Sequence, residues 1–402
     1  MSGNEIIVRA MTGSEEDVAA AADIVYLAWP EVAKPCTEAM IRRDPWRDQQ
    51  MAFGAFAGSR LVSYARFHYR PVRVGSARLR MAGVADVVTV PEFRRQGLAK
   101  RVLSAGVDWM RSSGMTCALL FTGVPYVYSG LGWGEVREAK LSLPMRALPR
   151  LGSGRCRIGE AHFTELPAEL ARIYEVSCGS HPISLARTPA YWRNWPSWMI
   201  GNGAFTLSDE WVVAWRGDQL AAYGVAAHSS IAEICSLPGE EEALFDVFDG
   251  LVERMRRRRR DRQLQLDLPL DHPLAGRLAV HAKKEAEVCG MILVLDLPGL
   301  LRELGPELAQ RWHAAQPGCL RLESPLGAAT LTVDRGEVRV DAAAGAPMLR
   351  LTPRGLSSLL LGFQSAGDLQ QAGQIEGDAE ALEVVHQLFP WLFSHFWEVD
   401  RY

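Results

Sequence analysis

The 402-residue chain lacks the cysteine and histidine spacings that hold metal ions or build disulfide frameworks. Its seven cysteines are odd in number and scattered, and no two of them form a Cys-x-x-Cys motif. The nine histidines form no His-x-x-x-His motif and no cluster with cysteine. We therefore expect reduced thiols, as in the cytoplasm, and no metal site.

Long apolar runs and a strong excess of one charge are also missing. No run approaches the roughly 20 residues that a transmembrane helix needs, so we expect no membrane span. The first residues are polar and acidic, unlike a signal peptide. The net charge of −3 gives no general attraction to nucleic acid, and the arginine run at 256–260 is expected to be a solvated helix end. These features favour a cytoplasmic protein with no nucleic-acid partner.

Two common phosphate-binding motifs are absent, and a third pattern takes their place. The chain has neither a Gly-x-Gly-x-x-Gly nor a Gly-x-x-x-x-Gly-Lys-[Ser/Thr] motif at a strand-helix junction. Instead, an apolar strand at 87–90 ends at Pro91, and residues 94–99 lead through Gly97 into an amphipathic helix. The unpaired N–H groups at a helix start favour anions. The stretch therefore predicts a pyrophosphate site.

The pattern of residues 94–99, [Gln/Arg]-x-x-Gly-x-[Gly/Ala], resembles the acetyl-CoA signature of the GNAT acetyltransferase superfamily. The first 150 residues predict the element order β-α-β-β-β-α-β-α-β, which is also that of a GNAT domain. Local signals support this order, and they include a helix N-cap at Ser14, a hairpin at Gly58-Ser59, a short helix at Tyr126–Leu131 and a last strand at Trp133–Leu143.

The GNAT resemblance implies roles for particular residues. Backbone groups of Val88, Thr89 and Val90 would bind the pantetheine arm of acetyl-CoA, like an added strand. The pyrophosphate would lie against the loop amides of Arg95, Gln96, Gly97, Leu98, Ala99 and Lys100. The motif Tyr-x-x-x-Gly-[Phe/Trp] matches residues 128–133, so Tyr128 would be the general acid that protonates departing CoA, with Tyr126 as the nearby alternative.

The general base has more than one candidate. Many GNAT enzymes use a carboxylate on the strand before the phosphate loop, and Asp86 lies in that region. Asp86 has a structural alternative, in which it pairs with Arg78 or Arg80 at a strand end.

The rest of the chain predicts two further domains. Residues 151–296 resemble a second, degenerate GNAT fold, with acids at 240–242 where a phosphate would bind, and this domain would shape the acceptor cleft. A boundary is expected at Leu297-Pro298-Gly299. Residues 297–402 resemble a sterol-carrier-protein-like domain, with a hairpin turn at 334–336 and a helix that starts at Thr352-Pro353. The predicted fold class is mixed αβ, with residues 1–150 as the catalytic domain.

This three-part order resembles the enhanced intracellular survival family of bacterial N-acetyltransferases. That resemblance implies a homohexamer and an amine acceptor such as an aminoglycoside, a polyamine or lysine. It also implies that the terminal carboxylate, here on Tyr402, is the general base, which makes Tyr402 preferred over Asp86. A cationic acceptor would favour acids in the cleft, for which Glu398, Asp400 and Asp86 are candidates.

Two other functions stay open at this point. The chain could be a lipid-binding or regulatory module that uses its C-terminal domain and carries a vestigial acetyltransferase site. It could also transfer acyl groups longer than acetyl. The phosphate loop at 94–100 and Tyr128 favour an active acetyltransferase.

Overall fold

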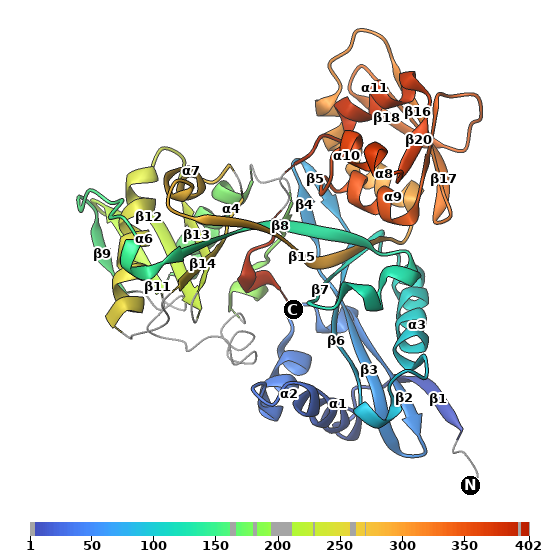
Figure 1. The fold of residues 1–402 in the computed structure, drawn as a ribbon, viewed down its shortest axis with the longest axis horizontal. Helices are drawn as coiled ribbons and strands as arrows, with labels where there is room; N and C mark the ends of the chain where they lie inside the picture. Colours follow the sequence, from blue (N-terminus) through green and yellow to red (C-terminus); the bar gives the residue numbers. More distant parts are fainter. Residues whose placement is uncertain are drawn as a thin grey trace.

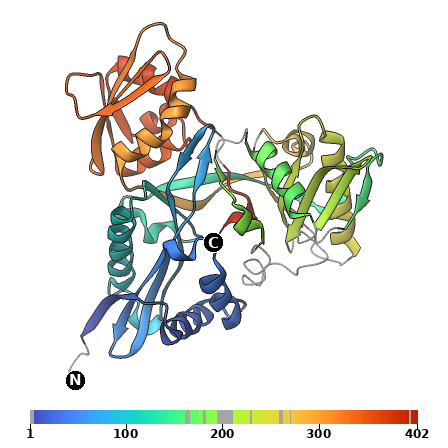
Figure 2. The ribbon, with the colours of Figure 1, turned by 180° about the vertical axis from the view of Figure 1, so that it is seen from behind.

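A computed structural model describes residues 5–160, 166–179, 183–193, 211–227, 230–257, 263–269, 271–392 and 395–401. These residues form an N-terminal, a middle and a C-terminal lobe (Figure 1). Seen from behind, the described tail residues 395–401 lie between the N-terminal and middle lobes (Figure 2). Buried apolar side chains form one cluster within the N-terminal lobe and a larger cluster that continues through the other two lobes.

The N-terminal lobe is a twisted sheet covered by helices on both faces. Its strands are β1 (Ile6–Met11), β2 (Gln50–Ala57), β3 (Arg60–Tyr69), β6 (Met81–Thr89) and β7 (Cys117–Phe121), adjacent in that order. Its helices are α1 (Glu15–Ala28), α2 (Lys34–Arg43) and α3 (Leu98–Ser112). The predicted cap of α1 is confirmed, because the Ser14 side chain accepts a hydrogen bond from the Asp17 amide.

The side chains of strand β3 point alternately to the two faces of the sheet in this lobe. Phe67 points toward α3, where an added Cβ on Gly106 would lie 2.0 Å from its ring, so only glycine fits there. Tyr64 and Arg66 point to the other face and, with α1, line a cavity. Because side chains alternate along a strand, α3 and α1 cover opposite faces of the sheet.

The middle lobe has a similar sheet with helices packed on it. Its strands are β9 (Arg157–Gly159), β11 (Trp211–Arg216), β12 (Gln219–Ala227), β13 (Ser230–Ser236) and β14 (Gln263–Asp267). Its helices are α4 (Pro167–Cys178), α6 (Glu241–Arg257) and α7 (Pro273–Leu278). Strand β13 leads through a short loop into α6, so the acids at 240–242 lie where a helix begins after a strand.

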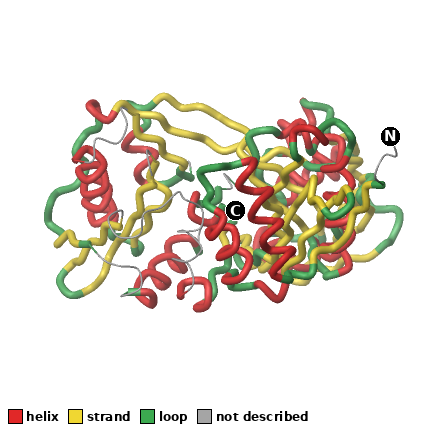
Figure 3. Tube along the Cα trace, turned by 90° about the horizontal axis from the view of Figure 1, so that it is seen from below, coloured by secondary structure: helices red, strands yellow, loops and turns green. Residues whose placement is uncertain are grey.

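Two long strands join the N-terminal and middle lobes. These are β8 (Gly134–Pro144) and β15 (Lys283–Val294), which cross between the lobes in the view from below (Figure 3). Strand β15 is inserted between β7 and β8, and β8 pairs onward with β14. In the described part of the chain, twelve strands thus form one continuous sheet. Strand β15 falls within predicted domain 151–296 but pairs with β7 of the first lobe, so the two lobes are interleaved.

A small second sheet also links these lobes. Strands β4 (Val72–Val74) and β5 (Ala77–Leu79) form a hairpin, and β10 (Ser184–Leu185) of the middle lobe pairs with β4. The side chain of Arg73 in β4 extends this link through an ion pair with Glu175 of α4, with Nη1 to Oε2 at 2.5 Å.

The C-terminal lobe is a five-stranded sheet with four helices in the described residues. Its strands are β16 (Gly318–Ser324), β17 (Gly327–Asp334), β18 (Glu337–Asp341), β19 (Met348–Leu351) and β20 (Ile375–Gly377). Its helices are α8 (Leu297–Arg311), α9 (Pro353–Leu360), α10 (Ala366–Gln371) and α11 (Ala379–Leu388). The predicted turn between β17 and β18 is confirmed, with positive φ angles at Arg335 and Gly336. The Thr352 cap of α9 is also confirmed.

Two local expectations need correction. The helix expected at 126–131 is two short 3₁₀ turns, Pro125–Val127 and Ser129–Leu131, because Gly132 at φ 86° ends the second. Helix α2 was not expected, since its apolar pattern is weak over ten residues. Helix α8, the first element of the C-terminal lobe, begins at Leu297, within the residues 297–299 where a boundary was expected, and the Asp296 side chain caps it.

Candidate active site

Strand β6 separates from its neighbour β7 along half of its length. The parallel pairing of the two strands runs from Met81 opposite Cys117 to Gly83 opposite Leu119. On its other side, β6 stays paired with β3 as far as Thr89 opposite Ser63. Among the described residues, no strand pairs with β6 from residue 84 onward on the β7 side. This free edge has the geometry that accepts an extended ligand as an additional strand.

A β-bulge lies at the point where the strands separate. Ala85 pairs with Arg66 and Val88 pairs with Tyr64, so two residues of β6 oppose one residue of β3. The extra residue is Asp86, whose φ of 56° is left-handed, a conformation that aspartate tolerates better than most residues. The bulge turns the Asp86 carboxylate toward Arg66, whose Nε donates to Oδ2 at 2.8 Å.

Asp86 does not form the expected alternative ion pair with Arg78 or Arg80. Its partner is Arg66, which is buried on β3, and Arg80 pairs instead with Glu303 of α8. The Asp86 side chain is 14% exposed, so it can meet a ligand. The candidate base is therefore a carboxylate in an ion pair, at the surface of a cavity.

The loop from residue 94 to residue 100 forms an open helix N-terminus, as the sequence predicts. Arg95 and Gly97 have φ angles of 63° and 73°, and α3 begins directly after Gly97. The first backbone hydrogen bond of the helix runs from the Arg101 amide to the Gly97 carbonyl, at 3.1 Å. The amides of residues 98–100 thus precede the helix's own hydrogen bonds and are the donors that an anion would meet. The side chains of Arg94, Arg95 and Gln96 are exposed.

A cavity of about 540 Å³ adjoins the free edge of β6. It lies on the α1 and α2 side of the sheet, opposite α3. Its lining includes Val25 and Trp29 of the α1 segment, Met40 of α2, Val84 and Asp86 of β6, Phe121 at the end of β7, and Tyr128. The candidate base and the candidate acid therefore line the same cavity.

Tyr128 is held rigidly in the wall of this cavity. It is 5% exposed, and its ring packs edge-on against Trp133 with the centroids 6.1 Å apart. Burial raises the pKa of Tyr128 to about 12, and a hydrogen bond with Thr122 opposes this increase. Tyr128 is therefore protonated at neutral pH. Tyr126, the alternative acid, is 76% exposed and does not line the cavity wall formed by the described residues.

The C-terminal tail, residues 395–401, is buried between the N-terminal and middle lobes. Phe396 packs edge-on against Phe121, with the centroids 5.9 Å apart, and its amide donates to Glu138 of β8. The Arg401 guanidinium lies 5.3 Å from the centroid of Phe121, which itself lines the cavity. The preferred base, Tyr402, lies outside the described residues.

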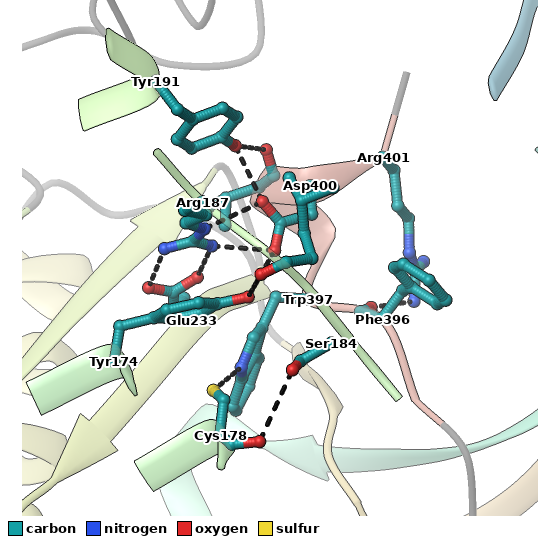
Figure 4. Close-up of polar contacts among 12 residues, drawn as sticks. Tyr174, Cys178, Ser184, Arg187, Tyr191, Glu233, Phe396, Trp397, Asp400 and Arg401 are labelled. Atoms are coloured by element: carbon teal, nitrogen blue, oxygen red, sulfur yellow. Dashed lines mark hydrogen bonds and ion pairs between the residues drawn. The ribbon is translucent and has the colours of Figure 1, made fainter. Parts of the chain in front are cut away.

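A buried ion cluster anchors this tail in the middle lobe (Figure 4). Arg187 donates to Asp400 through Nε at 3.0 Å and Nη2 at 2.8 Å, and to Glu233 of β13 through Nη1 at 3.0 Å. The three side chains are at most 1% exposed. Asp400, expected to face a cationic acceptor, is instead committed to this cluster because Arg187 neutralises it. Glu398, the other tail acid, accepts a hydrogen bond from Ser230.

Sequence reasoning did not find Arg187 or Glu233. Neither lies in a motif, and their partner Asp400 is 213 residues from Arg187. An available signal was the pair of aromatic residues, Tyr191 and Trp192, that follow Arg187 in the sequence. The guanidinium of Arg187 lies 5.4 Å and 4.9 Å from their ring centroids.

The described part of the chain has neither a metal-binding cluster nor a membrane-spanning helix. No group of three or more histidine, cysteine or carboxylate side chains is arranged to hold a metal ion. None of the described helices is long and apolar enough to span a membrane.

Family comparisons agree with this geometry. Residues 8–136 match the model of the acetyltransferase (GNAT) domain, and residues 322–395 match that of the sterol carrier protein domain. A search of curated proteins found no match to the sequence. The N-terminal lobe is a GNAT acetyltransferase domain, and the enzyme class that this domain defines is N-acetyltransferase.

Solved structures share the whole architecture at low sequence identity. A probable N-acyltransferase from Enterococcus faecalis V583 has a TM-score of 0.77 and 16% identity, over 98% of this chain and 99% of its own. A GCN5-related N-acetyltransferase from Kribbella flavida has a TM-score of 0.72 and 18% identity, over 100% and 99%. Eis1 from Mycobacterium abscessus has a TM-score of 0.67 and 16% identity, over 99% and 100%. The predicted fold class, two tandem GNAT folds followed by a sterol-carrier-like domain, is confirmed.

Proposed function

We propose that the chain transfers the acetyl group of acetyl-CoA to a primary amine by direct attack of the amine on the thioester. The observation that carries this proposal is the cavity wall, in which protonated Tyr128 and the carboxylate of Asp86 flank the free edge of β6. In the step itself, the amine nitrogen bonds to the acetyl carbon and the carbon-sulfur bond breaks. Tyr128 donates its proton to the leaving thiolate, and the base removes a proton from the amine.

Acetyl-CoA would extend from one face of the sheet to the other. The pyrophosphate would lie against the amides of residues 95–100, at the N-terminus of α3. The pantetheine arm would then run along the backbone of Val88, Thr89 and Val90, and bring the thioester through the gap between β6 and β7 toward Tyr128. The free β6 edge and the left-handed Gly97 support this path.

Replacing Gly97 by alanine should weaken acetyl-CoA binding by about 5- to 30-fold, since a left-handed residue with a Cβ costs about 1–2 kcal/mol. No atom lies within 4 Å of the added Cβ, so the effect comes from the backbone alone. The dissociation constant from calorimetry measures it. Gly276→Ala is the matched control, because Gly276 is helical and also has open space around it. Equal affinity for the two variants would contradict the loop assignment.

We propose the terminal carboxylate of Tyr402 as the general base, with Asp86 as the second candidate. The packing of the described tail supports this, because the Arg401 guanidinium lies 5.3 Å from the ring centroid of Phe121, which lines the cavity. An α-carboxyl group has a reference pKa of about 3.5, so it acts as a base only when it is partly desolvated or relayed through water. The tail is packed against buried aromatic side chains, which favours such desolvation.

An extension of the chain by two glycines beyond Tyr402 tests this role. With acetyl-CoA and a panel of an aminoglycoside, a polyamine and a lysine peptide, we expect kcat for CoA release to fall by about 100-fold in the extended chain. Acetyl-CoA affinity should be unchanged. Equal turnover of both chains would exclude Tyr402 and leave Asp86 as the base. No turnover by either chain, with this panel or with the monoamine 2-phenylethylamine, would favour the lipid-binding or regulatory alternative, for which the sterol-carrier-like domain is the supporting feature.

The assembly and location are carried over from the family resemblance. We propose a homohexamer, which light scattering of the purified protein would test, and a cytoplasmic location, which cell fractionation would test.

A further inference from the structure

The cavity beside Tyr128 is mostly apolar. Nine of its thirteen described lining residues have apolar side chains, and its volume is about 540 Å³, far more than an acetyl group fills. It lies on the face of the sheet opposite the α3 anion site, so the space is on the acceptor side of the thioester path. Trp29, 38% exposed, stands at its mouth.

The described residues that line the cavity offer little negative charge. Asp86 is the one formally charged residue among the described residues of its lining, and Arg66 already balances it through a 2.8 Å ion pair. Two acids of the neighbouring tail region are also paired with cations, and a third, Glu398, accepts a hydrogen bond from Ser230. Asp400 pairs with Arg187, and Glu138 pairs with Arg401. An acceptor with several ammonium groups would therefore bury charges that the described residues do not neutralise.

We propose that the acceptor is a primary amine with a single positive charge and an aromatic or branched aliphatic body. This inference rests on the proposed acetyl transfer and narrows its substrate class. The apolar body would fill the space between the α1 segment and Phe121, and the amine would lie near Asp86. Apolar surroundings disfavour the charged form of an amine, so the neutral nucleophile forms more easily there. The resemblance to aminoglycoside-modifying enzymes thus does not extend to the chemistry of this cavity.

The test compares acceptors on the full chain at saturating acetyl-CoA. We expect kcat/KM for 2-phenylethylamine to exceed that for spermine and for neomycin by at least about 100-fold, because an unpaired buried charge is strongly disfavoured. Trp29→Glu should reduce this preference by about tenfold, since it replaces an apolar surface with a carboxylate that can pair with a second ammonium group. Trp391→Glu is the control, because Trp391 is 47% exposed and follows helix α11 of the C-terminal lobe.

The possible outcomes separate this inference from the proposed function. A preference for spermine or neomycin in the unaltered chain would overturn the inference and leave acetyl transfer standing. A higher kcat/KM with octanoyl-CoA than with acetyl-CoA would also overturn it, because the cavity would then hold the acyl chain of the donor. Acetyl-CoA binding without acetylation of any amine would overturn the proposed function and the inference together.

Discussion

Replacing Tyr128 by phenylalanine should lower kcat for acetyl transfer by about 10²- to 10⁴-fold, the range that a positioned acid contributes. The substitution removes the hydroxyl group alone. The ring would keep its edge contact with Trp133 and its buried position, so the fold should be unchanged. Acetyl-CoA affinity should also stay the same, since the donor would be held by the α3 N-terminus and the β6 edge. Steady-state kinetics and calorimetry on the same preparation measure both quantities.

The control for this variant is Tyr126→Phe. Tyr126 lies two residues away in the same loop but is 76% exposed, so loss of its hydroxyl should change kcat by less than about threefold. If both variants retained full activity, another group would have to protonate the thiolate. If Tyr126→Phe alone were inactive, the two tyrosines would have been assigned the wrong way round.

The pH dependence of kcat gives a second check on Tyr128. Burial raises its pKa to about 12, so the acid form persists through the alkaline range in which most tyrosines begin to ionise. Between pH 7 and about pH 10, kcat should therefore show no fall that depends on the Tyr128 hydroxyl. A fall centred near the reference tyrosine pKa of about 10, lost in Tyr128→Phe, would contradict this environment.

Local signals were sufficient to predict much of the fold. The Ser14 cap, the turn at 334–336 and the Thr352 cap are decided by a few neighbouring residues, and each is found in the structure. The strand-loop-helix around Gly97 belongs to the same group, since only the order of an apolar strand, a proline, a glycine and an amphipathic helix is needed. The candidate acid Tyr128 could be selected because its motif is contiguous.

Contacts between distant segments could not be predicted in this way. The second half of strand β15, residues 288–294, is apolar and could pair with several strands, and nothing local specifies insertion between β7 and β8. The partner of Asp86 depends on the register of β3 against β6 and on a bulge, so Arg66 could not be distinguished from Arg78 or Arg80. The low charge of the cavity lining could not be predicted either, since the lining residues come from several separate elements.

Replacing Arg187 by methionine should lower the free energy of unfolding by about 3–5 kcal/mol, because it leaves buried carboxylates without their cation. In the unaltered chain one arginine faces both Glu233 and Asp400, and its guanidinium also stacks on Tyr174 at 3.7 Å. Burial raises the pKa of Glu233 to about 7 while Arg187 opposes the increase. Without Arg187 the Glu233 carboxyl group would have to take up a proton to stay buried.

This reasoning fixes the sign of the pH effect in Arg187→Met. A carboxyl group whose folded-state pKa is raised stabilises the fold at low pH, and that stability is lost as the pH rises through the folded-state pKa. The free energy of unfolding that Arg187→Met loses relative to the unaltered chain should therefore be larger at pH 8 than at pH 5.5. Urea unfolding at the two pH values measures it. Arg216→Met is the control, since Arg216 is 46% exposed in its pair with Glu240 and should cost less than about 1 kcal/mol.

Arg187→Met also tests whether the ion cluster holds the tail. Asp400 is two residues before the proposed base, and Tyr191 donates to the same carboxylate at 2.7 Å. Loss of the cluster should release residues 395–401 from the middle lobe, so digestion by carboxypeptidase should become faster and kcat should fall together with stability. The fall in kcat should exceed any change in acetyl-CoA affinity, because the donor would bind on α3 and β6. Unchanged digestion and an unfolding free energy equal to that of Arg216→Met would show that Arg187 does not anchor the tail.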